Sequence, residues 1–251
     1  MKKYGYKGIV NHQDFINEVD LSNLVGLKEI GDFFIDMQDY SDWFHFILNN
    51  QDIMVPVRPL KYGISWQTLY QLGIVYSDTD GPGDHPSPIN KPRNQNVYVV
   101  VNGETYKVTL LKGLNEEISI KNKTMNFHEL SLDNIKLMVN NSEWNQLLYR
   151  VFDGGDSIDG YLTNPIVGGW DRINNKDLGT GIQINYGAMN WCQEAAFKPH
   201  DTRVLRGGRN ISSISDYTAS SSSFYISGWR PALRKIDPGY ESSIFDFSNT
   251  K

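Results

Sequence analysis

The chain has 251 residues and a formal net charge of −5, with 39% hydrophobic residues, 12% aromatic residues and one cysteine, Cys192. This length allows one large domain with a full core, and a single cysteine excludes an intrachain disulfide and any multi-cysteine metal site. The Lys and Arg residues are scattered along the chain, which argues against nucleic acid, because binding to phosphates needs clustered positive charge.

The first 31 residues differ from the rest of the chain in their pattern of apolar residues. They lack the apolar run of a signal peptide, and the longest plain apolar run of the chain, VYVVV, is too short to cross a bilayer. We therefore expect a soluble protein, made in a cytoplasm, that does not enter a membrane. Phe15, Val19 and Leu24 match one face of a helix. Residues 1–31 are predicted to form an N-terminal arm that is either a frayed terminus or an attachment segment.

Two strands and a helix are expected after residue 32. The stretches WFHFIL and DIMVPV are typical of strands joined by a short turn over NNQ. In SWQTLYQLGI, Ser65 is a good N-cap, and Trp66, Leu69 and Tyr70 lie on one face.

A hairpin and a second helix follow a long polar stretch. VYVVV and ETYKVTLL are apolar strands around Asn102-Gly103, which predicts a two-residue turn with both residues at positive φ. SEWNQLLYRVF predicts a helix that is capped by Ser142. Its inward face is expected to carry Trp144, Leu147, Leu148 and Val151.

Two acidic loops, residues 78–85 and 153–160, suggest calcium at first sight, but neither has the ligand spacing and closing glutamate of an EF-hand. We interpret them as polar, turn-rich surface loops, and an incidental calcium or sodium ion in either stays open. The five histidines lack zinc-ligand spacing, and there is no phosphate-binding loop or nucleophile elbow. The sequence predicts no metal site and no cofactor.

Cys192 is the one candidate nucleophile. It lies beside Trp191, Gln193 and Glu194, and no histidine is near in sequence to lower its pKa. A single cysteine flanked by tryptophan is more typical of a small buried hydrophobe. We predict no catalytic residue.

The last third of the chain has little periodicity until RVLRGG, residues 203–208, and GWRPAL, residues 228–233. Before them, Trp170, Tyr186 and Trp191 are spaced among Gly, Asn and Asp, and such a segment can order only by packing its aromatics over a small core. The two motifs bracket a serine-rich run. Residues 238–251 are predicted to be a short C-terminal tail.

Several short motifs carry a resemblance to a known family. WCQE at residues 191–194, RVLRGG and GWRP resemble the formylglycine-generating-enzyme type of the C-type-lectin fold. More narrowly, SWQTLYQLGIVY, the Asn-Gly hairpin, SEWNQLLYRV and GWRPAL resemble phage and prophage structural proteins that carry this domain. The resemblance covers about residues 35–235. It implies an α+β, C-type-lectin-like mixed fold with two helices, short twisted strands and long irregular loops over residues 32–237.

The resemblance implies the fold and not the oxidase chemistry, because the oxidising enzymes use a pair of cysteines and this chain has one. It implies a non-enzymatic virion protein of the tail, fibre or capsid surface that displays its domain to a host-surface glycan. Residues 1–31 would attach it to other virion proteins or to further copies of itself. The alternatives are a cellular or prophage carbohydrate- or protein-binding module, and a capsid decoration protein without an adhesion role.

The scaffold residues would be Arg203, Arg206, Gly207, Gly208, Trp229 and Arg230. Gly207 and Gly208 would allow a tight approach of the backbone, and Trp229 would fill the core. Arg206 or Arg230 would pair with Glu194. Residues 209–226 would need no particular side chain for folding, so they can face a ligand, although the serine run can equally be a solvated linker. Tyrosine offers a flat face to a sugar ring, and serine and asparagine match its hydroxyls. The predicted ligand-binding residues are Arg209, Asn210, Ser213, Tyr217, Ser221 and Tyr225, joined by Trp170.

Overall fold

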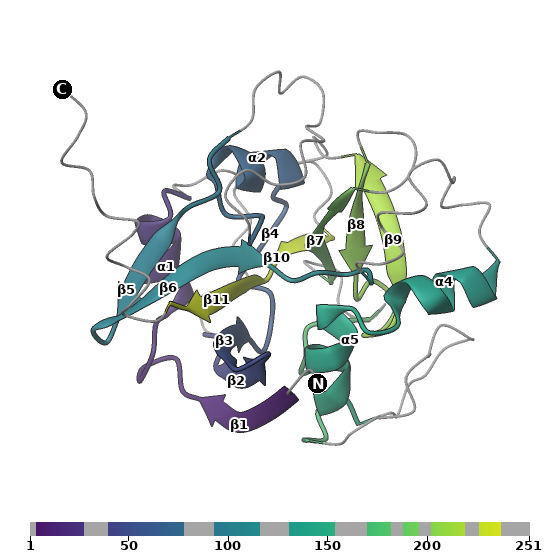
Figure 1. Ribbon diagram of the computed structural model, residues 1–251, viewed down its shortest axis with the longest axis horizontal. Helices are drawn as coiled ribbons and strands as arrows, with labels where there is room; N and C mark the ends of the chain where they lie inside the picture. Colours follow the sequence, from purple (N-terminus) through teal and green to yellow (C-terminus); the bar gives the residue numbers. More distant parts are fainter. Residues whose placement is uncertain are drawn as a thin grey trace.

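The computed structural model describes residues 4–27, 40–77, 93–115, 131–153, 170–181, 188–195, 202–218 and 226–236. Two β-sheets and a few short helices make up this part of the chain (Figure 1). The α+β class expected from the sequence is confirmed.

The larger sheet has six strands, and every neighbouring pair is antiparallel. In spatial order they are β1 (Tyr4–Val10), β2 (Trp43–Leu48), β3 (Gln51–Pro56), β11 (Pro231–Lys235), β6 (Glu104–Leu110) and β5 (Tyr98–Val101).

The second sheet has five strands and is mixed, because β10 runs parallel to β7 and the other pairs are antiparallel. Its order is β4 (Lys61–Tyr62), β10 (Ser227–Trp229), β7 (Met189–Ala195), β8 (Thr202–Arg206) and β9 (Ile214–Thr218).

Both predicted hairpins are confirmed. Asn49 and Asn50 form the turn between β2 and β3, and Asn102 and Gly103 form the turn between β5 and β6. All four residues have positive φ, which Asn and Gly adopt more easily than other residues.

The two predicted helices are confirmed with their caps. The Ser65 hydroxyl accepts a 3.0 Å hydrogen bond from the Thr68 amide at the start of α2 (Trp66–Gln71). The Ser142 hydroxyl accepts a 3.2 Å bond from the Asn145 amide at the start of α5 (Glu143–Leu147), which continues as the 3₁₀ helix η2 (Leu148–Val151). The inward residues predicted for this helix are buried.

A third helix, α4 (Leu132–Val139), is not among those predicted. The Ser131 hydroxyl accepts from the Asn134 amide, and Ile135, Met138 and Val139 are buried. Their i, i+3, i+4 spacing is the helical signal that this stretch carries.

The N-terminal segment is part of the fold over residues 4–27, which differs from the expectation of a separate arm. β1 pairs with β2 along its length, and the segment ends in helix α1 (Glu18–Leu24). Ile16, Leu21 and Val25 are buried in the core, because the helix lays its apolar face on the sheet. The boundary at residues 31–32 and the tail 238–251 lie outside the described residues.

The chain passes from one sheet to the other at Arg230. β10 ends at Trp229 in the five-stranded sheet, and β11 begins at Pro231 in the six-stranded sheet. Trp229 is fully buried, as predicted, in a core cluster with Trp43 and Trp66. A second cluster, on Trp144 and Phe46, packs against the other face of the large sheet.

Candidate functional site

Arg206 of β8 is fully buried and ties three parts of the chain together. Its guanidinium donates to the Gly113 carbonyl oxygen at 2.8 Å, to the Asn145 Oδ1 at 2.7 Å, and to the backbone carbonyl oxygens of Ser213 at 3.1 Å and Ser212 at 3.2 Å. Burial lowers the pKa of Arg206 to about 10, so the side chain remains a cation at neutral pH. It therefore fixes the β8–β9 turn against α5 and residue 113.

Glu194 of β7 makes neither of the ion pairs expected from the sequence, although all three residues are in the described part of the chain. Its carboxylate accepts from the backbone amides of Gly113 at 2.9 Å and Leu114 at 3.2 Å. Burial raises the pKa of Glu194 to about 7, against the opposing effect of these backbone bonds. Arg206 and Arg230 instead donate to backbone and amide oxygens. The carboxylate of Glu194 is therefore paired with backbone amides, which the sequence does not reveal, and not with either arginine.

Two further buried arginines lie over tryptophan rings. The Arg203 guanidinium is 4.4 Å from the ring centroid of Trp66, and that of Arg230 is 5.6 Å from the ring centroid of Trp144. Arg230 also donates to the Leu178 carbonyl oxygen, and burial lowers its pKa to about 9. These contacts join β8 to α2 and the β10–β11 junction to α5, as expected for a structural role.

The β8–β9 turn is close-packed. Gly207 has φ of +94°, and a Cβ there would lie 2.8 Å from the Ala188 carbonyl oxygen. A Cβ on Gly208 would lie 2.7 Å from the Met189 Cε. The predicted tight approach of this Gly-Gly pair is confirmed.

Asn210 and Ser213 build this turn and do not face solvent. They are 1% and 6% exposed. The Asn210 Oδ1 accepts from the amides of Ser212 and Ser213, each at 3.0 Å, and the Ser213 hydroxyl accepts from the Arg209 amide at 2.9 Å. The expectation that this stretch needs no particular side chain is wrong at these two positions, because both satisfy backbone groups in a turn.

The other predicted ligand residues are distributed differently. Arg209 is exposed beside the turn. Tyr217 lies on β9, where its backbone pairs with Arg203, but its side chain, Ser221 and Tyr225 lie outside what the structure describes.

Trp170 is half-buried in an aromatic cluster. It stacks on Tyr6 at 5.8 Å between ring centroids, and the Arg150 guanidinium lies 5.0 Å from its centroid. Its ring contacts are therefore with β1, β2 and η2.

Three strand ends meet at one end of the five-stranded sheet. Ala195 at the end of β7 pairs with Arg203, and Thr202 at the start of β8 pairs with Thr218 at the end of β9. Ala195, Thr202 and Thr218 thus lie at the same end of the sheet. Two of the predicted ligand residues, Ser221 and Tyr225, follow Thr218 in the sequence and lie outside the described residues.

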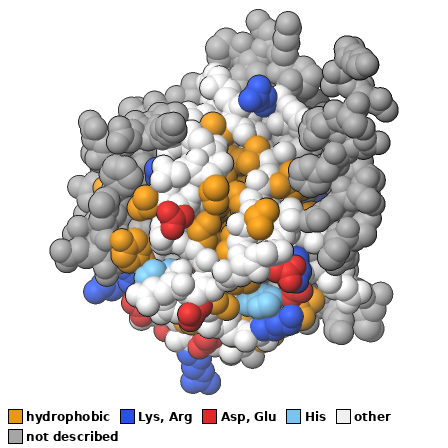
Figure 2. Space-filling model, turned by 90° about the vertical axis from the view of Figure 1, so that its left-hand side faces the viewer, with side chains coloured by type: hydrophobic (Ala, Val, Ile, Leu, Met, Phe, Trp, Pro, Cys, Tyr) orange, Lys and Arg blue, Asp and Glu red, His pale blue; other side chains and the backbone are white. Residues whose placement is uncertain are grey.

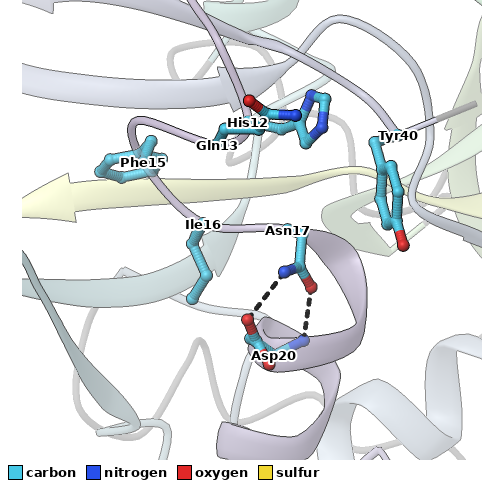
Figure 3. Close-up of a pocket in the computed structure, with 7 residues that line it drawn as sticks. All are labelled: His12, Gln13, Phe15, Ile16, Asn17, Asp20 and Tyr40. Atoms are coloured by element: carbon cyan, nitrogen blue, oxygen red, sulfur yellow. Dashed lines mark hydrogen bonds between the residues drawn. The ribbon is translucent and has the colours of Figure 1, made fainter.

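A hollow of about 320 Å³ lies beside the N-terminal segment, and none of its lining residues is among the ligand-binding residues predicted from the sequence (Figure 3). Tyr40 bounds it on one side and Phe15 on the other. It is lined by His12, Gln13, Phe15, Ile16, Asn17, Asp20 and Tyr40. The polar run His12–Asp14 before the helix is the only sequence signal for it, and Tyr40 reaches it from a separate segment.

His12 is held in place by two contacts. Its Nδ1 lies 3.0 Å from the Asp42 Oδ1, which also accepts from the His12 amide at 3.0 Å. A carboxylate oxygen only accepts, so the proton is on Nδ1 and the Nε2 is the second polar atom of the ring. The ring also stacks on Tyr40, with 4.9 Å between centroids and 21° between planes.

Asn17 and Asp20 form the opposite wall of the hollow (Figure 3). The Asn17 Oδ1 accepts from the Asp20 amide at 2.9 Å, and the Asn17 Nδ2 donates to the Asp20 Oδ2 at 2.7 Å. This reciprocal pair is the N-cap of α1. It fixes both side chains before any ligand arrives.

One face of the molecule collects hydrophobic side chains. Figure 2 shows them gathered in the middle of the side that carries α1 and β5, with charged and histidine side chains along one edge. The exposed apolar residues of these elements are Val19 and Leu24 on α1 and Val100 on β5. Phe15, predicted to share this face, packs instead against the rings of Trp43 and Tyr106.

Cys192 is fully buried, as predicted for a small apolar residue, and burial raises the pKa of its thiol well above the usual value. Among the described residues, no group of three or more His, Cys, Asp or Glu side chains is arranged to hold a metal ion. Apart from Asp153, the two acidic loops lie outside the described residues, and no helix of the described segments is long and apolar enough to span a membrane.

These features define an α+β protein in which buried arginines brace a mixed sheet. No family model, curated protein or solved structure matches the chain.

Proposed function

We propose that the protein is a non-enzymatic virion structural protein that displays a C-type-lectin-like domain for binding to a host-surface glycan. The main support is the bracing of β8 and the β10–β11 junction by Arg203, Arg206 and Arg230. Each guanidinium is buried and lies over a tryptophan ring or bonds to backbone oxygens. A scaffold fixed in this way tolerates variable connections at its edge.

The chemistry of the buried ionisable groups supports a structural role. Glu194 and Arg206 have strongly shifted pKa values, and the charged group of each is hydrogen-bonded to backbone groups. Cys192 is buried with a raised pKa, the opposite of an activated nucleophile. Cys192 and Arg206 are fully buried, so neither offers a reactive atom to solvent.

The proposed contact surface consists of Tyr217, near the end of β9, with Ser221 and Tyr225 of the stretch that follows. Arg209 lies in the β8–β9 turn at the other end of these two strands, and Asn210 and Ser213 are buried, so these three predicted residues are not part of it. Tyrosine and serine bind polar ligands while losing little conformational entropy. Single contacts with sugars are weak, so several copies on one particle would supply avidity.

The attachment surface in this proposal is formed by Val19 and Leu24, the exposed apolar side chains of α1. Exposed apolar patches often mark protein–protein contacts. Val19→Asp with Leu24→Asp should reduce incorporation into particles without unfolding the chain, because both residues are exposed, at 39% and 57%. Leu137→Asp, at an exposed site on α4, is the matched control. Mass spectrometry of purified particles measures incorporation.

Adsorption to host cells tests the binding role. Labelled protein carrying Tyr217→Ala and Tyr225→Ala should adsorb several-fold less than wild type at matched thermal stability. Leu137→Ala serves as the surface control. Unchanged adsorption would remove this surface from the proposal, and absence of the protein from purified particles would favour a cellular carbohydrate-binding module.

A further inference from the structure

We propose that the hollow beside the N-terminal segment is a binding site for a neutral hydroxylated ring, such as one pyranose unit of a glycan. The inference goes beyond the proposed function, because the hollow is built by residues 12–20 and Tyr40, whereas the proposed contact surface follows β9. Either site can exist without the other.

The size of the hollow suits a small ligand. Its volume of about 320 Å³ is at the lower end of the range of about 300–1,000 Å³ that small-molecule sites span. A single sugar ring fits such a space, whereas a nucleotide or a peptide would extend beyond it.

Several polar groups of the hollow are available to a ligand. Three polar groups of the lining have no hydrogen-bond partner among the described residues: the His12 Nε2, the Gln13 side-chain amide and the Tyr40 hydroxyl. Asp20 accepts from Asn17 through Oδ2, so its Oδ1 is available to a ligand. Together they supply both donors and acceptors. A sugar hydroxyl both donates and accepts, so it matches this mixed set better than a purely accepting anion does.

The site is fixed before a ligand binds. His12 is bonded to Asp42 through its ring and its amide, and it stacks on Tyr40. Asn17 and Asp20 hold each other, and beneath them the buried Ile16 accepts a 2.7 Å hydrogen bond at its carbonyl oxygen from the Trp43 indole. A preorganised wall avoids the entropy cost of ordering side chains on binding.

The aromatic and apolar part of the lining completes the match. Tyr40 is 45% exposed, with one face on His12, so the remainder of its ring is open to a ligand. Phe15 and Ile16 add apolar surface. A pyranose ring has apolar C–H faces, which pack on such groups while its rim of hydroxyls meets the polar atoms.

The charge of the hollow selects against anions. Among the described residues that line the hollow, Asp20 is the only carboxylate, and none is Lys or Arg. A phosphate, a sulfate or an acidic sugar would meet the charge of Asp20 with no Lys or Arg beside it in this part of the lining. A neutral ring avoids this penalty.

Backbone amide NMR of the full chain, titrated with glucose, galactose and N-acetylglucosamine, tests the proposal. At least one sugar is expected to shift the signals of residues 12–20 and of the Trp43 indole. Tyr40→Ala should weaken binding about fivefold to tenfold, as expected for loss of a ring contact. Tyr40→Phe keeps the ring and should have a smaller effect. Tyr217→Ala with Tyr225→Ala should leave these shifts unchanged.

The outcomes separate the two sites. Shifts confined to residues near β9 that vanish in Tyr217→Ala with Tyr225→Ala would contradict sugar binding in the hollow and support the proposed contact surface. Shifts at residues 12–20 that persist unchanged in Tyr40→Ala would also overturn it, as would no shift at saturating sugar. N-acetylneuraminic acid, an acidic sugar, should bind more weakly than the neutral sugars, and tighter binding would contradict the charge argument.

Discussion

The guanidinium of Arg206 donates a 2.7 Å hydrogen bond to the Oδ1 of Asn145, which joins the RVLRGG strand to the helix of SEWNQLL. These two stretches lie far apart in sequence. The same guanidinium holds backbone oxygens of Gly113, Ser212 and Ser213. One side chain thus supplies the donors for a junction of three segments.

Replacing Arg206 should destabilise the whole fold. Arg206→Ala leaves buried acceptor oxygens without donors and opens a cavity, so we expect a loss of about 3–5 kcal/mol in the free energy of unfolding. Urea unfolding followed by circular dichroism measures it. Arg209→Ala, in the same turn but exposed, should change stability by less than about 0.5 kcal/mol. Equal effects of the two changes would contradict the assigned role.

Substitution of two glycines with positive φ distinguishes the stability cost of backbone strain from the cost of steric crowding. Gly103 has φ of +78° and a Cβ there would meet nothing within 4 Å, whereas a Cβ on Gly207 would contact the Ala188 oxygen and the Thr180 Cγ2 at 2.9 Å or less. Gly103→Ala should cost about 1–2 kcal/mol from the backbone alone. Gly207→Ala should cost about 1–3 kcal/mol more. Thermal unfolding of both variants compares the two, and equal losses would refute the crowding.

Gly113 and Cys192 should be energetically coupled. A Cβ on Gly113 would lie 2.7 Å from the Cys192 Sγ, so Gly113→Ala should destabilise by about 1–3 kcal/mol. In the double variant with Cys192→Ala the clash with sulfur is gone, and the combined loss should fall short of the sum by at least about 0.5 kcal/mol. Cys192→Ala with Gly103→Ala is the additive control.

Glu194 should make stability depend on pH. Its pKa is about 7 in the fold, against 4.5 for the ordinary carboxyl group. Well below pH 4.5 the carboxyl group is neutral in both the folded and the unfolded chain, and its contribution to the free energy of unfolding is fully present. As pH rises from 4.5 to 7, the unfolded chain ionises first, so the free energy of unfolding falls, by at most about 1.4 kcal/mol per pH unit.

Chemical unfolding between pH 4.5 and pH 8 checks this. Glu194→Gln keeps an oxygen that accepts from the backbone but does not ionise, so the fall should flatten in this variant. Asp133→Asn, at a highly exposed position on α4, should retain the wild-type slope. An unchanged slope in Glu194→Gln would show that another group causes the dependence.

Local signals allowed much of the fold to be predicted. The Asn-Gly turn and the Ser65 and Ser142 caps act through neighbouring residues, so the sequence reveals them directly. Residues 1–31 were expected to be an arm because the pairing of β1 with β2 is a long-range contact that no local pattern encodes. The partners of Glu194 were missed for a related reason, since backbone amides have no sequence signature.

The candidate sites were harder to predict. Serine and asparagine after RVLRGG suggested a surface for ligands, yet Asn210 and Ser213 use their side-chain polar atoms in hydrogen bonds to the backbone of the turn. Composition does not distinguish a polar side chain that faces water from one that satisfies its own backbone. The hollow was missed because His12 and Tyr40 come from separate segments and meet only in the folded chain.

The passage of the chain from β10 in one sheet to β11 in the other, at Arg230, has a consequence for folding during synthesis. β11 lies between β3 and β6, and Leu233 pairs with both Met54 and Val108. The hairpins β2–β3 and β5–β6 can form early from local contacts, but they cannot join until residues 231–235 have left the ribosome. Such non-local pairing slows folding and leaves unpaired edges exposed meanwhile. We expect nascent chains that end before residue 227 to be captured by chaperones, or to aggregate, more readily than the complete domain.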